Sequence, residues 1–261
     1  MQMIQSRTSE TVKALVRLRD SAAQRERQGY FLAEGLRLCT DLAAVWTPRQ
    51  VYATQAALDA HPALAGLGPE PCLIAPTVAE KLSDTKSTQG VFGVFPLPGT
   101  GAPLKKGGRY LALEHVQDPS NVGALMRSAA AFGFDGVLLC SHCADPFSPK
   151  ALRACMGTVP RLALSWYDSV PQMARELRAA GIPLIAAALR RAVPLDSAQT
   201  ALQAGAAVLV GNEGNGLTDE AVDCADITVR IPMAPGVESL NAAVAGSVLL
   251  WHFRGSVCGR T

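Results

Sequence analysis

Residues 111–140 read LALEHVQDPSNVGALMRSAAAFGFDGVLLC, and this stretch decides the fold. Two short apolar runs, Leu111–His115 and Gly136–Cys140, flank a segment from Val122 to Phe132 whose apolar residues recur at helical spacing. A strand, a helix and a second strand in this order form a βαβ unit, in which the two strands are parallel. We therefore predict an α/β fold built on a parallel sheet.

The same alternation continues toward the C-terminus. Arg175–Ala180 reads as the end of a helix, and apolar runs at Leu184–Ala188, Ala206–Val210 and Ile227–Ile231 are typical of buried parallel strands. Aromatic residues make up only 5% of the chain, as expected where small residues pack helices closely on a sheet. These elements extend the predicted sheet.

The composition of the 261 residues excludes several classes of protein. With 49% hydrophobic and 18% charged residues, the chain is neither disordered nor fibrous. The net charge of +2 does not by itself indicate a polyanionic partner, so a nucleic-acid contact has to come from local clusters. No apolar run reaches the roughly 18 residues of a membrane helix, and Arg7 and Glu10 do not fit a signal peptide. We expect a cytoplasmic protein.

The seven cysteines do not indicate a disulfide scaffold, because the chain is long enough to bury its own core. Five are interpreted as reduced thiols: Cys39, Cys72, Cys155, Cys224 and Cys258. The pair Cys140 and Cys143 suggests a redox dithiol or half of a zinc site. The redox interpretation fails because Asp145–Pro149 follows where an active-site helix should begin, and the zinc interpretation lacks a second ligand pair. We expect no metal.

The stretch Leu97–Gly108, LPGTGAPLKKGG, is the best candidate for a domain boundary because it has no apolar periodicity. We predict a first domain over residues 1–98, a linker over 99–108 and a second domain over 109–261. Residues 1–108 carry a net charge of +3 and residues 109–261 a net charge of −1. The basic excess therefore lies in the first domain.

This excess is concentrated before Tyr30. The candidates for RNA binding are four arginines: Arg17, Arg19, Arg25 and Arg27. A solvated helix face is the simpler interpretation of such a run, and a patch that follows the phosphates of a nucleic acid is the functional one.

The turn before the first helix contains the first candidate site residues. Pro119 and Asn121 are typical of turns and helix N-caps, so structure alone could account for both. The helix is expected to bury one apolar stripe: Val122, Leu125, Met126 and Ala129. Arg127 points away from this stripe and would lie over Gly123, at the carboxyl end of the preceding strand, where open α/β sheets bind ligands. On helix geometry alone, a solvated side chain is the simpler interpretation of Arg127.

A second cluster, Gly211–Leu217 or GNEGNGL, again follows a strand. Its glycines suggest a loop whose backbone approaches a ligand closely, but their spacing matches neither the dinucleotide fingerprint nor the phosphate-binding loop. A pyrophosphate ligand is therefore disfavoured, and a ligand without phosphates stays open. Glu213 is either a solvated turn residue or a carboxylate that holds Arg127 or a hydroxyl-bearing ligand.

A third cluster, Ile231–Asn241 or IPMAPGVESLN, opens a helix with one apolar stripe: Leu240, Val244, Val248 and Trp251. Ser239 is a candidate for the N-cap of this helix, and a functional role is the alternative interpretation. Asn241, in the first turn, has a weaker structural explanation.

These three clusters, in this order, resemble the motifs of the SpoU/TrmH family of RNA ribose 2′-O-methyltransferases in the SPOUT superfamily. The family's first motif, Asn-x-Gly-x-x-x-Arg, is matched by Asn121, Gly123 and Arg127. Its second motif is matched by Gly211–Leu217, and its third by Ile231–Met233 with Ser239–Asn241. The resemblance covers residues 110 to about 253 and includes the segment 153–157, RACMG. The segment 30–35, YFLAEG, is similar to a small ribosomal-protein-like RNA-binding domain.

The resemblance implies a parallel sheet with a C-terminal trefoil knot, a rare exception to unknotted topology, preceded by a small α/β ribosomal-protein-like RNA-binding domain. It implies S-adenosylmethionine as the cofactor, contacted by Gly211, Ile231 and Leu240. It also implies homodimers through the knotted domain, with active sites at the interface.

The resemblance assigns catalysis to Arg127, with Glu213, Ser239 and Asn241 orienting it and the ribose, and RNA binding to Asn121. A guanidinium group stays protonated in proteins and is therefore a poor base. Orientation and charge stabilisation by Arg127, or a phosphate relay, are therefore the better descriptions, and none of the four histidines lies within the motifs at a place to take the proton.

The implied substrate is structured RNA, and the extra N-terminal domain favours ribosomal RNA. The alternatives are the same chemistry on transfer RNA, a knotted RNA-binding protein without catalysis, and a methyltransferase that acts on something other than RNA.

Overall fold

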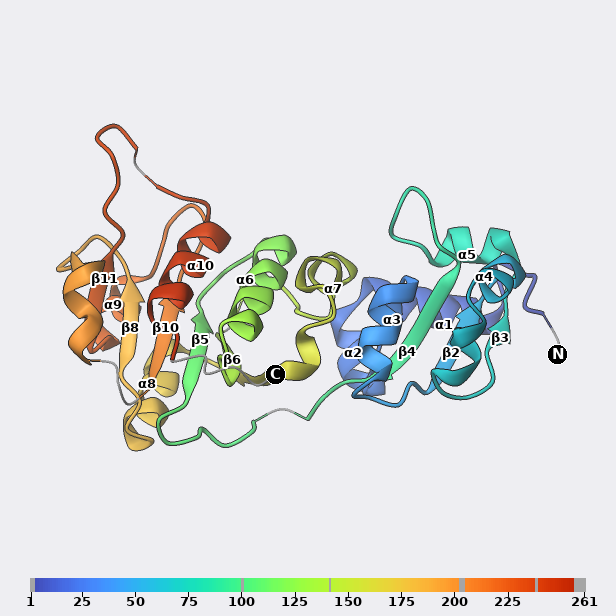
Figure 1. Cartoon of the computed structure of the whole chain (residues 1–261), viewed down its shortest axis with the longest axis horizontal. Coiled ribbons are helices and arrows are strands. Elements are labelled where there is room, and N and C mark those ends of the chain that lie inside the picture. The colour runs from blue at the N-terminus through green and yellow to red at the C-terminus, as the bar shows by residue number, and fades with distance from the viewer. Residues whose placement is uncertain (1–2, 100, 141, 202–204, 238, 256–261) are drawn as a thin grey trace. The chain divides into compact units, whose positions relative to one another are not determined.

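The computed structural model describes residues 3–99, 101–140, 142–201, 205–237 and 239–255, with only the backbone of residues 199–201. The chain forms two compact units (Figure 1). The first comprises Met1–Pro98 and Asp145–Pro160, and the second comprises Gly99–Ala144 and Arg161–Thr261. The chain therefore leaves the second unit after Ala144 and returns to it at Arg161.

The first unit is built on a mixed sheet. In its described part the strand order is β1-β4-β2-β3, with β4 antiparallel to β1 and β2, and β3 parallel to β2. The strands are β1 (Tyr30–Glu34), β2 (Gln50–Ala53), β3 (Cys72–Leu73) and β4 (Val91–Pro96). The helices are α1 (Glu10–Asp20), α2 (Ala22–Gln28), α3 (Leu36–Ala43), α4 (Gln55–Ala60), η1 (Pro62–Gly66), α5 (Pro76–Leu82) and α7 (Pro149–Cys155).

Helix α1 shows why the first unit folds as it does. Its N-cap is Ser9, whose hydroxyl accepts a hydrogen bond from the backbone N–H of Val12 at 3.3 Å. Val12, Leu15 and Leu18 recur at helical spacing, and all three are buried. They share one core cluster with residues of α5, β1 and β4, so this core joins α1 to the sheet.

Helix α7 packs in the first unit, although the sequence analysis places residues 145–160 in the second domain. Phe147, just before α7, contacts Phe31 of β1 with ring centroids 4.9 Å apart, and Phe31 stacks on Phe95 of β4 at 5.9 Å. Leu152 of α7 is buried. The pattern of a seven-residue helix is the same wherever the helix packs, so the sequence gives no sign of this placement. The domain limits stay a prediction.

The second unit is built on a parallel sheet, as the sequence predicts. In its described part the strand order is β7-β6-β5-β10-β8-β11-β9, and every neighbouring pair is parallel. The strands are β5 (Arg109–Leu113), β6 (Gly136–Cys140), β7 (Ala163–Tyr167), β8 (Leu184–Ala187), β9 (Val193–Pro194), β10 (Ala206–Val210) and β11 (Ile227–Arg230). The helices are α6 (Pro119–Ala131), α8 (Val170–Ala179), η3 (Leu195–Ala201), α9 (Asp219–Cys224) and α10 (Ala242–His252), and the short helix η2 (Val159–Arg161) spans the boundary between the two units. The predicted strands match β6 and β10 in full, and β5, β8 and β11 within two residues.

Alternate residues of β10 face two different helical layers. Ala207 and Leu209 belong to the core cluster that includes residues of α8 and α9. On the other side α10 lies close, because a Cβ at Gly246 would be 3.2 Å from Cγ2 of Val210. Helices α10 and α6 are neighbours, joined by a 2.8 Å hydrogen bond between the hydroxyls of Ser128 and Ser247. This arrangement places the first turns of α6 and α10 beside the carboxyl end of β10.

The buried stripe predicted for α6 is confirmed, because all four of its residues are fully buried. The apolar stripe of α10 does not face the core. Val244 and Trp251 are 50% and 54% exposed, while the helix buries Gly246, Leu249 and Leu250. Helix α10 is apolar on every side, so its sequence does not decide which face packs.

All six cysteines among the described residues are free thiols, and Cys258 lies outside the described residues. Burial raises the pKa of Cys140 to about 12 and that of Cys143 to about 11, so both stay protonated at neutral pH and are unsuited to redox chemistry. In the described part of the chain, no helix is long and apolar enough to cross a bilayer, and no cluster of His, Cys, Asp or Glu could hold a metal ion.

Candidate active site

A cavity of about 460 Å³ lies at the carboxyl ends of β8, β10 and β11. Its volume falls within the range of small-molecule sites, about 300–1,000 Å³. Five of the predicted site residues line it: Gly211, Glu213, Ile231, Ser239 and Leu240. The structure therefore brings the second and third motifs together around one cavity, at the strand ends where α/β sheets bind ligands.

The loop Gly211–Leu217 closes on itself. The backbones of Asn212 and Gly216 exchange two hydrogen bonds of 3.0 Å, and Oδ1 of Asn212 accepts two more from N–H groups of the loop. A Cβ at Gly211 would lie 2.5 Å from the carbonyl of Gly216, which itself has a φ of +69°. These two glycines are needed for the turn itself, and both also line the cavity, so a close approach of the loop backbone to a ligand stays a prediction.

Glu213, within this loop, binds the turn before α6. Its carboxylate accepts hydrogen bonds from the backbone N–H groups of Gln117 and Asp118 at 3.3 and 3.2 Å, and from Nδ2 of Asn121 at 2.9 Å. Partial burial works to raise the pKa of Glu213, but these hydrogen bonds outweigh it and hold the pKa below its ordinary value. Glu213 is therefore ionised at neutral pH. It holds the first motif by Asn121 and the backbone, and no described contact joins it to Arg127.

Asn241 connects the third motif to the same network. Its Nδ2 donates to Oδ1 of Asn121 at 3.1 Å, and its own Oδ1 accepts from the N–H groups of Ala243 and Val244. Asn241 is therefore the N-cap of α10, and of the two interpretations of Ser239 the one as the cap of this helix is wrong. Ser239 is exposed and lines the cavity instead. Both residue types cap helices well, and the bond to Asn121 favours Asn241.

Asn121 lies in the first turn of α6, because the N-cap of that helix is Asp118. It is 7% exposed, and its amide is shared between Glu213 and Asn241. Asn121 is therefore nearly buried and holds the two other motifs in place, while its contact with RNA stays a prediction. Asn121 joins the three motifs.

Arg127 lies on α6, off the buried stripe and exposed, as its helical position predicts. It does not line the cavity, and no hydrogen bond or ion pair joins it to another described residue. Within one chain, the structure does not bring Arg127 together with Glu213.

Two residues that the sequence analysis missed hold the other end of the loop. Glu114 is 5% exposed, and its carboxylate accepts hydrogen bonds from Oγ1 and N–H of Thr218 at 2.7 and 2.9 Å. Thr218 is the N-cap of α9, so Glu114 fixes the point where the loop enters that helix. The position of Glu114, a carboxylate directly after the apolar strand β5, is the feature of the sequence that could have indicated its role.

Arg25, predicted to bind RNA, is buried in the first unit with 4% exposure. Its Nε donates to Asp145 at 2.8 Å, and Nη1 donates to the carbonyls of Leu18 and Arg19. The assignment of Arg25 to RNA binding is therefore wrong, because its charge and its donors are used inside the protein.

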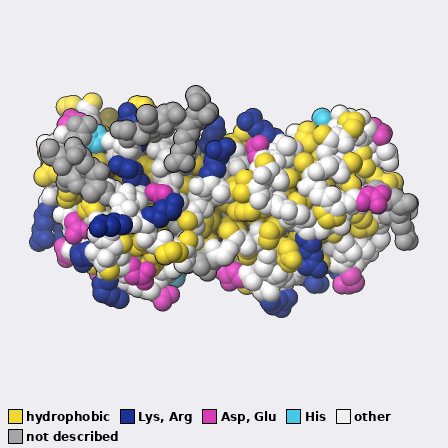
Figure 2. Space-filling model, turned by 60° about the horizontal axis from the view of Figure 1, so that its bottom comes forward, with side chains coloured by type: hydrophobic (Ala, Val, Ile, Leu, Met, Phe, Trp, Pro, Cys, Tyr) yellow, Lys and Arg dark blue, Asp and Glu magenta, His cyan; other side chains and the backbone are white. Residues whose placement is uncertain are grey.

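The guanidinium group of Arg19 also makes most of its hydrogen bonds within the first unit. It pairs with Asp20, and Nη1 donates to the carbonyls of Lys81 and Ser83 at 2.9 and 3.0 Å, which ties α1 to the end of α5. Arg17 and Arg27 stay exposed. On the face drawn in Figure 2, the basic side chains of the first unit stand apart from one another.

Comparison with known proteins shows the family of the chain. Residues 108–251 match the model of the SpoU rRNA Methylase family, and this match covers more than half of the sequence. The chain belongs to the SpoU rRNA methylase family. All three motifs of this SpoU methylase fall within the match, and residues 9–93 match an MRM3-like substrate binding domain.

Two named relatives resemble this SpoU methylase. The chain is 31% identical over 174 residues to the 23S rRNA (guanosine(2553)-2′-O)-methyltransferase RlmP of Bacillus subtilis, covering 67% of this chain and 68% of that protein. It is 28% identical over 250 residues to a 23S rRNA (uridine(2479)-2′-O)-methyltransferase of Streptomyces viridochromogenes, covering 91% of this chain and 87% of the other.

The fold of this SpoU methylase is also similar to a solved structure, an AdoMet-bound rRNA methyltransferase from Sinorhizobium meliloti. The TM-score is 0.82 at 28% identity, with 96% of both chains covered.

Proposed function

We propose that this SpoU methylase transfers a methyl group from S-adenosylmethionine to a ribose 2′-hydroxyl of ribosomal RNA. The observation that carries the proposal is the hydrogen-bond network from Glu213 through Asn121 to Asn241, which joins all three motifs beside one cavity. Side chains from distant segments that fix one another in this way are typical of a preorganised catalytic site.

The cavity suits S-adenosylmethionine. Its walls combine apolar side chains with loop backbone and contain no phosphate-binding loop, which fits a nucleoside cofactor without phosphates. Gly211, Ile231 and Leu240 would hold the cofactor, and Leu240, 38% exposed, would be covered by it. The AdoMet-bound neighbour supports this choice. When bound, S-adenosylmethionine supplies an electrophilic methyl group on a positively charged sulfonium.

The residues of the chain would orient the ribose and stabilise charge. Transfer to O2′ requires the hydroxyl proton to leave, and negative charge develops on the oxygen. Glu213 and Ser239, both on the cavity wall, would orient the hydroxyl, with Glu213 held by Asn121 and Asn121 held in turn by Asn241. A guanidinium group already carries its proton and cannot accept another, so Arg127 would stabilise the developing charge while the proton passes to a phosphate oxygen or to water.

Ribosomal RNA is the proposed substrate because both named relatives act on 23S rRNA and the first unit matches a substrate binding domain. Transfer RNA is the competing substrate, since the two RNAs present the same ribose chemistry. Arg17 and Arg27 are the exposed members of the predicted basic set, and we propose that they contact phosphates.

We further propose that the site is completed in a homodimer. The stripe Val244, Val248 and Trp251 on α10 is 37–54% exposed, and an apolar helix face of this kind is typical of an interface. Arg127 lies on the neighbouring helix α6 and outside the cavity of its own chain, so a second copy would supply it to the site. The parallel seven-stranded order of the described sheet supports the SPOUT architecture, in which the C-terminal segment forms a trefoil knot.

The test is methyl transfer in vitro from S-adenosylmethionine labelled on the methyl group. Ribosomal RNA and transfer RNA from a strain that lacks the gene serve as separate substrates. The proposal expects label in ribosomal RNA at one position, with the adjacent phosphodiester resistant to alkali because its 2′-oxygen is methylated. Label in transfer RNA would show that transfer RNA, and not ribosomal RNA, is the substrate. RNA binding with neither cofactor affinity in calorimetry nor transfer would establish a protein without catalysis.

A further inference from the structure

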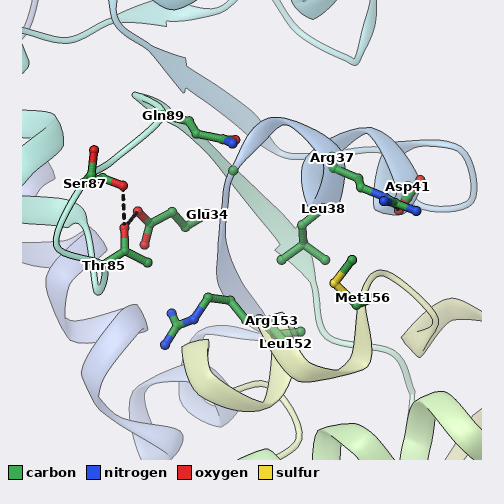
Figure 3. A pocket seen from close by; sticks show the side chains of 11 residues that line it. Glu34, Arg37, Leu38, Asp41, Thr85, Ser87, Gln89, Leu152, Arg153 and Met156 are labelled. Atoms are coloured by element: carbon green, nitrogen blue, oxygen red, sulfur yellow. Dashed lines mark hydrogen bonds and ion pairs between the residues drawn. The ribbon is translucent and has the colours of Figure 1, made fainter.

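A second cavity, of about 310 Å³, lies in the first unit. It is found where β1 ends and α3 begins, opposite the loop 85–89, and α7 forms its remaining wall (Figure 3). None of its lining residues belongs to the three motifs. Its volume is that of a small-molecule site rather than a packing defect.

The walls of this cavity are apolar on one side. Leu38 and Leu152 line it, and Met156 lies beside them, 40% exposed at the end of α7 (Figure 3). Met156 has a φ of +51°, and Gly157 after it lies so close to α3 that a Cβ there would be 2.7 Å from Asp41. The backbone thus fixes an exposed methionine at the cavity. A thioether in this position offers a polarizable contact to a flat aromatic ligand.

The rim of the cavity is built from polar groups that are held in place. The carboxylate of Glu34 accepts hydrogen bonds from the hydroxyls of Ser83 and Thr85 and from the N–H of Asp84, which fixes the loop against β1. Oε1 of Gln89 accepts the N–H of Leu36 at 2.9 Å. That bond orients the amide of Gln89 at the start of α3, and no described residue accepts from its two N–H donors, which could bind a ligand.

The charged groups around the cavity balance. The lining contains two carboxylates, Glu34 and Asp41, and two guanidinium groups, Arg37 and Arg153, so its formal charges cancel. Arg153 pairs with Asp84 through Nη2 at 2.7 Å, while its buried Nη1 has no partner among the described residues. A neutral lining does not favour a phosphate, and guanidinium groups can stack on a planar ring.

We infer that this cavity binds one unstacked nucleobase of the RNA substrate. Bases displaced from a helix are recognised by stacking on apolar or guanidinium surfaces and by hydrogen bonds to their edges, and the cavity offers both. Met156 and Leu38 would contact the ring, while Gln89 and Arg153 would reach its edge. The inference rests on the proposed function in taking RNA as the substrate, and it assigns α7 to substrate selection.

Two variants test the cavity without disturbing the core. Met156→Glu places a charge on the apolar wall, and Ser87→Trp fills the mouth from an exposed loop position. The matched control is Val45→Glu, the same change of charge at an apolar residue of the first unit that is 60% exposed and does not line the cavity. Thermal unfolding checks that all four proteins are folded.

The probe is ribosomal RNA from cells that lack the gene. We expect Met156→Glu and Ser87→Trp to weaken its binding by about 5- to 100-fold, the effect of losing one stacked base, and Val45→Glu to leave it unchanged. Calorimetry with S-adenosylmethionine should give the same affinity for all four proteins. Chemical probing of the RNA should show one unpaired base protected by wild type and by Val45→Glu but not by the cavity variants.

Equal RNA affinities for all four proteins, or no base whose protection depends on Met156, would overturn the inference, whether or not methyl transfer is seen. Base protection without methyl transfer would instead support base binding in the cavity and overturn the proposed function. If the cavity binds a protein and not a base, the RNA affinities of all four proteins should be equal, and this result overturns the inference.

Discussion

Nδ2 of Asn121 donates a 2.9 Å hydrogen bond to Oε1 of Glu213, a residue 92 positions away in the chain. The bond joins the first turn of α6 to the loop after β10, and Asn241 extends it to the start of α10. The same carboxylate that borders the cavity therefore holds the first motif in place. A change at any of the three residues is expected to disturb the other two.

Glu213→Gln tests the charge in this network through the pH dependence of stability. The lowered pKa of Glu213 means that its ionised form stabilises the fold above the ordinary value of 4.5, and that this contribution disappears as the pH falls through the lowered pKa. Thermal unfolding from pH 7 to pH 3 should show wild type more stable than the variant near neutrality, with the two melting temperatures converging in acid. A difference independent of pH would show that the charge contributes nothing.

Arg127→Ala is expected to abolish methyl transfer while cofactor affinity and thermal stability stay near wild type, because Arg127 is exposed and off the buried stripe. Turnover assays, calorimetry and thermal unfolding measure the three quantities. Near-normal turnover would show that Arg127 has no catalytic role.

Mixing Arg127→Ala with Asn241→Ala tests whether a second copy supplies the arginine. If it does, subunit exchange in an equal mixture should restore about a quarter of the sites, since half of the dimers then hold one intact site. If Arg127 acts within its own chain, every site keeps one defect and no activity returns.

Val244→Glu should convert the protein to a monomer, because a charge in the exposed α10 stripe would be buried by a second copy. Sedimentation analysis measures the mass, with Val45→Glu as the control. A variant that stays dimeric would place the interface elsewhere.

The arginines near the N-terminus should separate into two classes. Arg25→Ala is expected to lower the free energy of unfolding by about 2–4 kcal/mol, because it leaves Asp145 without its buried partner. Replacing Arg17 and Arg27 should leave stability unchanged but flatten the dependence of RNA affinity on salt by about 0.7–0.9 in log–log slope for each phosphate that is no longer neutralised. Denaturant unfolding and binding at several salt concentrations measure the two effects. An unchanged slope would show that these arginines are only solvated.

The sequence was most informative where a pattern is strong and local. The strands β6 and β10 and the buried stripe of α6 follow from apolar runs and helical periodicity, and both were predicted correctly. The cavity-lining positions of Gly211, Ile231 and Leu240 match the motifs of the family that the sequence resembles.

The predictions were wrong where a residue distant in the sequence decides whether a side chain is buried or caps a helix. The burial of Arg25 depends on Asp145, which lies 120 residues away, so a run of arginines gives no sign of it. Ser239 and Asn241 are equally good caps two residues apart, and the bond to Asn121 favours the second. Helix α10 is apolar on all sides, and its packing face follows from the close approach at Gly246.

The central claim is that this SpoU methylase methylates one ribose of ribosomal RNA, and mapping 2′-O-methylation across total RNA tests it most directly. RNA from the parent strain is compared with RNA from a strain that lacks the gene and from the same strain carrying wild type or Arg127→Ala. The account predicts one ribosomal nucleotide whose ribose methylation is lost with the gene, returns with wild type and does not return with Arg127→Ala. Identical maps in all four strains, or a change confined to transfer RNA, would contradict it.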